Sequence, residues 1–226
     1  MKSFAFLSIC GLLALSLSAC SNPFTPPVQS PDDDEVVLDR EPAPPATTPE
    51  QLMDNLARAM RDRDEVLYET LLDKDFLFTE WDCLGEVLYH NGFEEELEIM
   101  AGSRDGSRPG LFDHFRHQFT FNFEPRRRER ELGSEHPESF PGDPNGHPDE
   151  DWEVFYGRVQ MELLESAGDG VRVDQNMTFK LRLDPNDNLW KIIRWEDDAL
   201  EGDCGGASKP LANAFSWAAL KQKVAP

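Results

Sequence analysis

Basic residues are scarce in this 226-residue chain: 22 lysines and arginines stand against 44 aspartates and glutamates, and the formal net charge is −22. Such an excess of acid repels nucleic acid phosphates and anionic lipid headgroups, so no nucleic-acid partner and no basic membrane-binding patch are expected. The sequence also lacks a nucleophile elbow, a phosphate-binding loop and a dinucleotide fingerprint. No cofactor is therefore expected, and composition alone does not indicate an activity.

Long hydrophobic runs are lacking as well, and the one apolar segment, residues 4–17, is too short to span a bilayer as a mature helix. It follows a basic residue and ends in small residues, which is typical of a secretory signal peptide, here residues 1–19. Residues 17–20, LSAC, resemble the lipobox of bacterial lipoproteins. The resemblance implies cleavage between Ala19 and Cys20, a diacylglycerol on Cys20, and acylation of the new amino terminus, for example by palmitate. The alternative is an ordinary secreted protein with a chance cysteine.

The predicted lipid anchor also indicates a location and a partner. Serine rather than aspartate follows Cys20; in the lipoproteins that this sequence resembles, this favours the periplasmic face of the outer membrane if the source has one. The membrane is then bound through the acyl chains, and three chains hold firmly where one is marginal at about 0.8 kcal/mol per buried methylene. Residues 20–47 are rich in proline and acid, which predicts a disordered tether.

Cysteine is rare, with four residues in all. Cys10 is removed with the predicted signal peptide and Cys20 carries the predicted lipid, which leaves Cys83 and Cys204. An even pair in an oxidising compartment predicts a disulfide, which would close a loop of about 120 residues and stabilise the fold by about 4–5 kcal/mol in the chain-entropy model. Two separate free thiols are the alternative.

Helical signals are concentrated at the start of the predicted domain, residues 48–200. Thr48 fits an N-cap followed by proline, and the apolar side chains after it share one helical face. Asp64 fits the N-cap of a second helix, and residues 91–102 carry the start and stop signals of a third. Between them, residues 76–78 (FLF) predict a short buried strand.

Alternating hydrophobicity predicts strands in the second half of the chain. Turn signals between the last three predict an antiparallel meander. Residues 125–151 begin with PRRR, continue into acid, proline and glycine, and predict a mobile loop insertion. The tail, residues 201–226, predicts a short terminal helix that docks on the domain. The expected strands span residues 118–124, 154–164, 177–183 and 189–195.

Two segments point to a family. Residues 52–78 resemble the opening of nuclear transport factor 2-like (NTF2-like) domains: an amphipathic helix, a charged RDRD corner, a second helix and a Phe-x-Phe strand. Residues 187–197, DNLWKIIRWED, resemble the closing strand of the same superfamily. The resemblance implies an α+β fold in which a cone-shaped, strongly curved antiparallel sheet wraps around three N-terminal helices and encloses a pocket. The proteins most similar in layout are uncharacterised bacterial lipoproteins.

Candidate catalytic residues are few. The superfamily includes ketosteroid-isomerase-like and SnoaL-like enzymes, which need an acid or base in the pocket, but their catalytic residues do not match this chain one by one. The weak candidates Asp113, His114 and His117 precede a predicted strand, and a surface turn is the simpler interpretation. Aromatic residues could also line a pocket. Phe119, Phe121, Phe155, Phe179 and Trp190 are most simply explained as core, and Tyr156 is a further candidate to point into the pocket.

Two further histidines, His136 and His147, stand in the predicted insertion among several acidic residues, a composition that draws calcium in some proteins. Residues 142–151, GDPNGHPDED, lack the EF-hand pattern, so a solvated acidic loop is the simpler interpretation and no metal is expected.

Three functions are consistent with the sequence. The favoured one is a lipid-anchored, non-enzymatic domain of the cell envelope that binds a small apolar ligand or a protein. The second is a SnoaL-like isomerase, hydrolase or dehydratase acting on a small apolar substrate. The third is a structural envelope protein whose acidic surface or insertion makes the contact. Fold alone does not decide among them.

Overall fold

The computed structural model describes residues 41–137, 146–198 and 215–225, and one compact unit begins at Pro42. The predicted signal peptide, the lipobox with Cys20, residues 20–40 of the predicted tether, and Cys204 lie outside the described residues. Within the described part of the chain, no helix combines the length and the apolar character that crossing a membrane requires.

Three helices lie at the start of the unit; the first two begin at their predicted capping side chains, whereas the third begins at Gly92 without a side-chain cap and stops at Gly102 as predicted. The Thr48 hydroxyl accepts a hydrogen bond from the Gln51 N–H at 3.1 Å. The first helix ends at Arg63, whose φ of +52° is left-handed and lets its N–H bond back to the last turn. The Asp64 carboxylate caps the second helix by accepting from the Leu67 N–H at 2.9 Å. The helices are α1 (Pro49–Asp62), α2 (Glu65–Leu71) and α3 (Phe93–Ala101).

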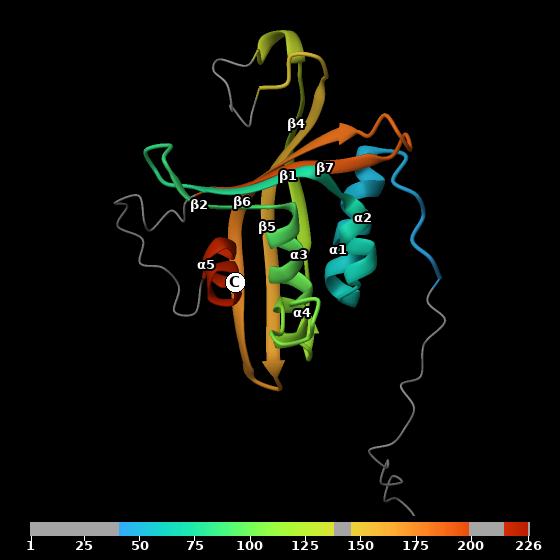
Figure 1. Cartoon of the computed structure of the whole chain (residues 1–226). Helices are drawn as coiled ribbons and strands as arrows, with labels where there is room; N and C mark the ends of the chain where they lie inside the picture. Colours follow the sequence, from blue (N-terminus) through green and yellow to red (C-terminus); the bar gives the residue numbers. More distant parts are fainter. Residues whose placement is uncertain (1–40, 138–145, 199–214, 226) are drawn as a thin grey trace, which may run out of the picture. The chain divides into compact units, whose positions relative to one another are not determined.

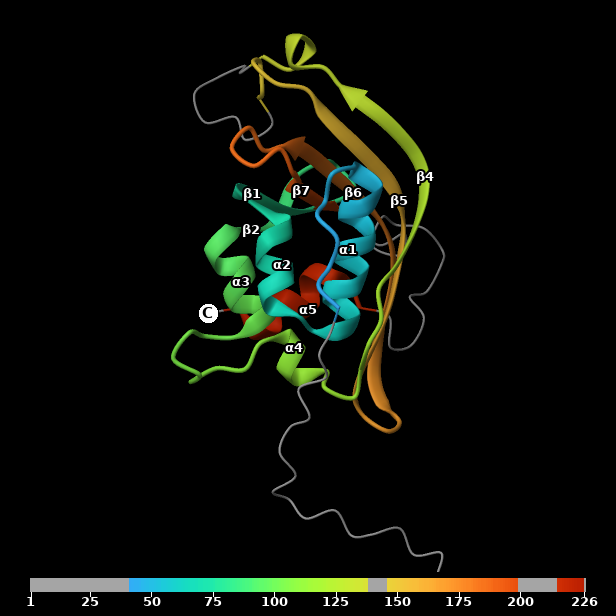
Figure 2. The same cartoon turned by 90° about the vertical axis from the view of Figure 1, so that its right-hand side faces the viewer.

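A seven-stranded sheet curves strongly around these helices, as Figure 1 and Figure 2 show. Its order is β2-β1-β7-β6-β5-β3, with β4 also paired to β5. The predicted α+β cone and the β5-β6-β7 meander are confirmed. One pair departs from the antiparallel prediction: β1 and β7 run parallel, which a long connection allows and a hairpin does not. The strands are β1 (Leu72–Trp81), β2 (Val87–Gly92), β3 (Gln118–Phe119), β4 (Asn122–Glu131), β5 (Trp152–Ser166), β6 (Asp169–Leu183) and β7 (Trp190–Asp197).

One strand, β2, lies where the sequence analysis predicts none, and the predicted strand 118–124 is divided into β3 and the start of a much longer β4. β2 forms a hairpin with β1. β4 runs to Glu131, well inside residues 125–151, so the prediction of a loop from Pro125 onward is wrong. β4 pairs with the long β5 as far as Trp152, and a register shift beside Pro125 lets an edge strand pass a residue without an N–H. Pairing with β5 overrides the polar, charged composition of this segment.

The C-terminal helix α5 (Trp217–Val224) lies on the concave side of the sheet, beside α3 (Figure 1 and Figure 2). Ser216 caps it by accepting a hydrogen bond from the Ala219 N–H at 3.0 Å. Trp217, Ala218 and Leu220 are buried in the same core as the sheet and α1–α3. The prediction of a docked terminal helix is confirmed for α5, and residues 201–214 and 226 of the predicted tail lie outside the described residues.

Candidate functional site

Aromatic side chains occupy the interior of the cone. Phe119 and Trp217 are perpendicular with ring centroids 6.3 Å apart, and Trp217 stacks on Trp195 at 6.2 Å. Tyr156 is half-buried on the face of β5 opposite its inward-facing neighbour, and Trp190 is only partly buried at the edge of the core. The other four predicted pocket residues are core: Phe119, Phe121, Phe155 and Phe179.

A buried carboxylate lies within this aromatic interior. Glu96 of α3 has no exposed surface and accepts three hydrogen bonds from three other elements. The Tyr68 hydroxyl of α2 donates to Oε1 at 2.6 Å. The Asn91 amide of β2 and the Lys221 ammonium of α5 donate to Oε2 at 2.7 and 2.6 Å. The network therefore joins α2, β2, α3 and α5 at one point, and Lys221 is itself fully buried.

Burial and charge act in opposite directions on the pKa of Lys221 and in the same direction on the pKa of Tyr68. Burial lowers the pKa of the Lys221 ammonium, although the adjacent Glu96 carboxylate opposes the shift. Burial raises the pKa of the Tyr68 hydroxyl well above its usual value, and the Glu96 charge adds to the effect. The ammonium also lies 3.5 Å from the centre of the Phe78 ring, a cation–π contact in a desolvated site.

A second buried acid, Asp197 of β7, lies close to the same network. Its side chain is completely buried and accepts a hydrogen bond from Trp195 Nε1 at 3.1 Å. Burial raises the pKa of the Asp197 carboxyl well above its usual value, and the positive charge of Lys221 offsets only part of that rise. The folded protein therefore holds a proton at Asp197 more tightly than the unfolded chain does.

Replacing Asp197 with asparagine should make stability less dependent on pH. Because the folded pKa is raised, wild-type stability is lost as pH rises from the unfolded pKa through the folded one. The Asp197→Asn variant carries no such charge, so it should exceed the wild type by more than ~1 kcal/mol at about pH 8 and match it at about pH 4. Urea unfolding at both pH values measures this. Asp54→Asn, on the exposed side of α1, is the control. An equal effect of both substitutions on stability would contradict the raised pKa of Asp197.

The predicted catalytic candidates do not face the interior. Asp113 and His114 lie at the exposed end of the short helix α4 (Leu111–His114), and His117 is exposed just before β3. Asp113 pairs with Arg116 at 2.9 Å on the surface. None of the three contributes to the buried network around Glu96, so within the described residues the acid and base groups of the interior are ones that the sequence analysis does not name.

Cys83 is disulfide-bonded at the turn between β1 and β2. Its predicted partner, Cys204, lies outside the described residues, so the pairing of these two cysteines stays a prediction.

A polar cluster lies on the outer face of the sheet, where β4 ends. His147 is almost completely buried, and its Nε2 lies 2.8 Å from Glu131 Oε1. The Lys180 ammonium lies 3.2 Å from Glu131 Oε2 and 3.7 Å from Glu196 Oε1. Partial burial acts to raise the pKa of Glu131, but the His147 hydrogen bond and the Lys180 charge outweigh it, so the pKa is lowered. This carboxylate is thus held ionised beneath the loop that contains His147.

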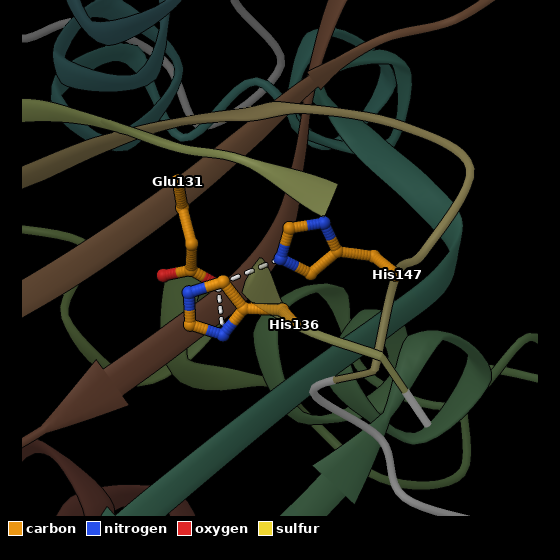
Figure 3. A group of neighbouring side chains, drawn as sticks. All are labelled: Glu131, His136 and His147. Atoms are coloured by element: carbon orange, nitrogen blue, oxygen red, sulfur yellow. Dashed lines mark hydrogen bonds and ion pairs between the residues drawn. The ribbon is translucent and has the colours of Figure 1, made fainter. Parts of the chain in front are cut away.

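His136 joins this cluster from the opposite end of the loop. Its Nδ1 lies 3.7 Å from Glu131 Oε1, and its ring is nearly parallel to that of His147, with centroids 5.1 Å apart. Figure 3 shows both imidazoles directed at the same carboxylate. The ligand-capable atoms of Glu131, His136 and His147 all lie within 4.8 Å of one another. The structure thus brings together two histidines that the sequence analysis assigns to a solvated loop.

Two sequence signals indicate these groups in retrospect. Glu96 follows Phe93 by three residues and precedes Met100 by four, so helical periodicity places it on the buried face of α3. His136 and His147 are each followed by proline, which biases a residue toward extended backbone and distinguishes them from the other three histidines. Lys221 gives no such signal, because lysine in a terminal helix is ordinarily solvated.

Comparisons with known proteins find similarity in structure only. No protein-family model and no curated protein matches the chain. The chain is similar to NTF2-like structures. One is an NTF2-like protein of unknown function in nutrient uptake from Rhodospirillum rubrum, at TM-score 0.39 and 16% identity, covering 66% of this chain and 95% of that one. An NTF2-like protein of unknown function from Shewanella oneidensis gives 0.38 and 14%, with 66% and 95% covered.

A subunit of an enzyme is also among the similar structures. The beta subunit of benzoate 1,2-dioxygenase from Burkholderia mallei has TM-score 0.42 and 10% identity, covering 68% of this chain and 89% of that one. The fold of this chain rests on its own strand order, its strand pairing and the helices on the concave face of its sheet, as described above.

Proposed function

We propose that this protein is a lipid-anchored, non-catalytic binding domain of the bacterial cell envelope that contacts a protein partner through the outside of the cone. The acyl chains on Cys20 hold it at the membrane, on the periplasmic face of the outer membrane in a Gram-negative source. The observation that carries the proposal is the position of α5. Trp217 and Lys221 are fully buried inside the cone, where a small apolar ligand would otherwise bind.

The partner surface that fits this proposal is the β1–β2 hairpin. Its turn and its second strand expose Leu84, Val87 and Leu88, by 86%, 47% and 61%. Among the described residues β2 is the end of the strand order, so its outer edge has no neighbouring strand. An unpaired edge flanked by exposed apolar side chains favours a partner that adds an extended strand.

Site-specific photo-cross-linking in the native host tests the proposal. A photo-reactive amino acid at Leu88 should give a discrete cross-linked protein from the membrane fraction, and the same probe at the exposed Arg104 should not. The Cys20→Ala variant should leave the membrane fraction and lose most of the cross-link. A bound apolar small molecule in native mass spectrometry of the purified protein, with no cross-link from Leu88, would overturn the proposal.

A SnoaL-like isomerase, hydrolase or dehydratase is the second candidate, and one observation favours it. Tyr68, Asn91 and Glu96 form a hydrogen-bonded acid and phenol group inside the cone, the kind of perturbed group that catalysis uses. However, the Lys221 ammonium already occupies one oxygen of Glu96, so a substrate would have to displace α5. Occupation by its own helix is why binding at the outer surface is the better-supported function.

A further inference from the structure

The outer-face cluster differs from an ordinary surface ion pair in how its histidines are held. Nδ1 of His147 lies 2.8 Å from the backbone carbonyl oxygen of Glu150, which can only accept a hydrogen bond. Nδ1 therefore carries a proton, and in the neutral ring the lone pair is on Nε2, the atom that faces Glu131. The ring is also stacked on Trp152 with centroids 3.8 Å apart, which fixes its plane.

This arrangement leaves two electron-rich groups in contact. A neutral imidazole would direct its Nε2 lone pair at the Glu131 carboxylate across 2.8 Å. A metal ion bound by both groups resolves the contact, because its charge attracts the carboxylate and the nitrogen lone pair alike. Histidine that ligates a metal characteristically donates its other N–H to a carbonyl or carboxylate, as His147 does here.

The third group adds to this ligand set. His136 directs its own Nδ1 toward the same carboxylate oxygen as His147. Two imidazole nitrogens and one carboxylate oxygen are a ligand set for zinc, whereas calcium and magnesium prefer oxygen alone. The Lys180 charge next to Glu131 opposes a cation, but Glu196 lies 3.7 Å from Lys180 and keeps it paired when a metal takes Glu131.

We propose that Glu131, His136 and His147 bind one Zn²⁺, with solvent in the fourth position. The side chain of His136 is 41% exposed, so an ion can enter from that side, while His147 and Glu131 at 1% and 12% form the buried wall. Bound zinc would link β4, through Glu131, to the residues on both sides of the 138–145 segment. Its effect on the protein is therefore to fix the outer end of the β4–β5 pair.

Calorimetric titration of the untagged full-length chain with Zn²⁺, after chelator treatment and in excess Mg²⁺, tests the site. One zinc per chain is expected. Loss of a partner of a ligating histidine alone weakens metal binding by about 10- to 100-fold, so His136→Ala should weaken it by at least ~100-fold. Because His136 is exposed, this variant should fold normally. His114→Ala removes an exposed histidine outside the cluster and should bind zinc like the wild type.

Two readouts separate a metal site from a simple ion pair. Zinc should raise the thermal midpoint of the wild type and of His114→Ala, but not of His136→Ala or His147→Ala. Cobalt should give a visible absorption band of similar intensity in the first two proteins and none in the last two. No zinc binding by the wild type, or equal binding by His136→Ala, would overturn the proposal and leave the cluster as a hydrogen-bonded group that binds no metal. Neither result depends on the protein partner proposed above.

Discussion

A Lys221→Met variant is expected to lose about 3–5 kcal/mol of unfolding free energy, because removing one partner of a buried pair leaves an uncompensated charge. The ammonium donates to Glu96 Oε2 at 2.6 Å and both side chains have no exposed surface. Methionine retains the length and apolar stem of lysine, so the loss reports the charge rather than packing. For a domain stable by about 5–15 kcal/mol, urea unfolding at neutral pH measures this easily.

The matched control is Lys223→Met on the same helix. Lys223 is exposed and makes one surface cation–π contact with the Phe215 ring, so its replacement should change stability by at most about 1 kcal/mol. The double variant Glu96→Gln with Lys221→Met should recover more than half of the loss. Asn91 Oδ1 has no hydrogen-bond partner among the described residues, so rotation of that amide lets it accept from the new glutamine. A single variant as stable as the Lys223→Met control would show that the pair does not hold α5 in place.

The parts of the fold that sequence predicts are those fixed by local chemistry. Thr48 and Asp64 cap the helices that they are predicted to cap, because the hydrogen bond that starts a helix spans only three residues. The β5–β6–β7 meander follows from alternation and tight turns in the same way. The parallel pairing of β1 with β7 is set by packing between distant segments, and no local pattern encodes it.

The candidate sites, like the fold, combine local features that the sequence predicts with contacts that only packing and strand pairing determine. Composition marks residues 125–151 as a solvated loop, but β5 offers β4 a partner as far as Trp152, and this pairing brings Glu131 next to His147. Hydrophobic pattern places Phe119 correctly in the core, yet it cannot show that Trp217, near the C-terminal end of the chain, fills the space beside it. The interior is made by contacts between residues far apart in sequence and the outer cluster by the pairing of β4 with β5, and periodicity detects neither.

The last prediction concerns the space beside Phe119 that Trp217 fills. A Trp217→Ala variant should lose about 3–5 kcal/mol of unfolding free energy, the usual cost of removing a large buried aromatic side chain. Trp217 is fully buried, perpendicular to Phe119 and stacked on Trp195. Its backbone N–H donates to Gln175 Oε1 at 2.8 Å, a bond that alanine keeps, so α5 should remain docked over the cavity.

Chemical rescue then distinguishes a filled cone from an open one. Apolar cavities of about 150 Å³ stay dry and bind small aromatic molecules, so added indole should raise the thermal midpoint of Trp217→Ala. Trp217→Phe, which leaves a much smaller void, should respond little, and the wild type should not respond at all. An equal rise in the wild type would mean that its cone already admits an aromatic ligand beside α5. The domain would then be a small-molecule binder, whereas rescue confined to Trp217→Ala supports a cone that its own C-terminal helix has closed.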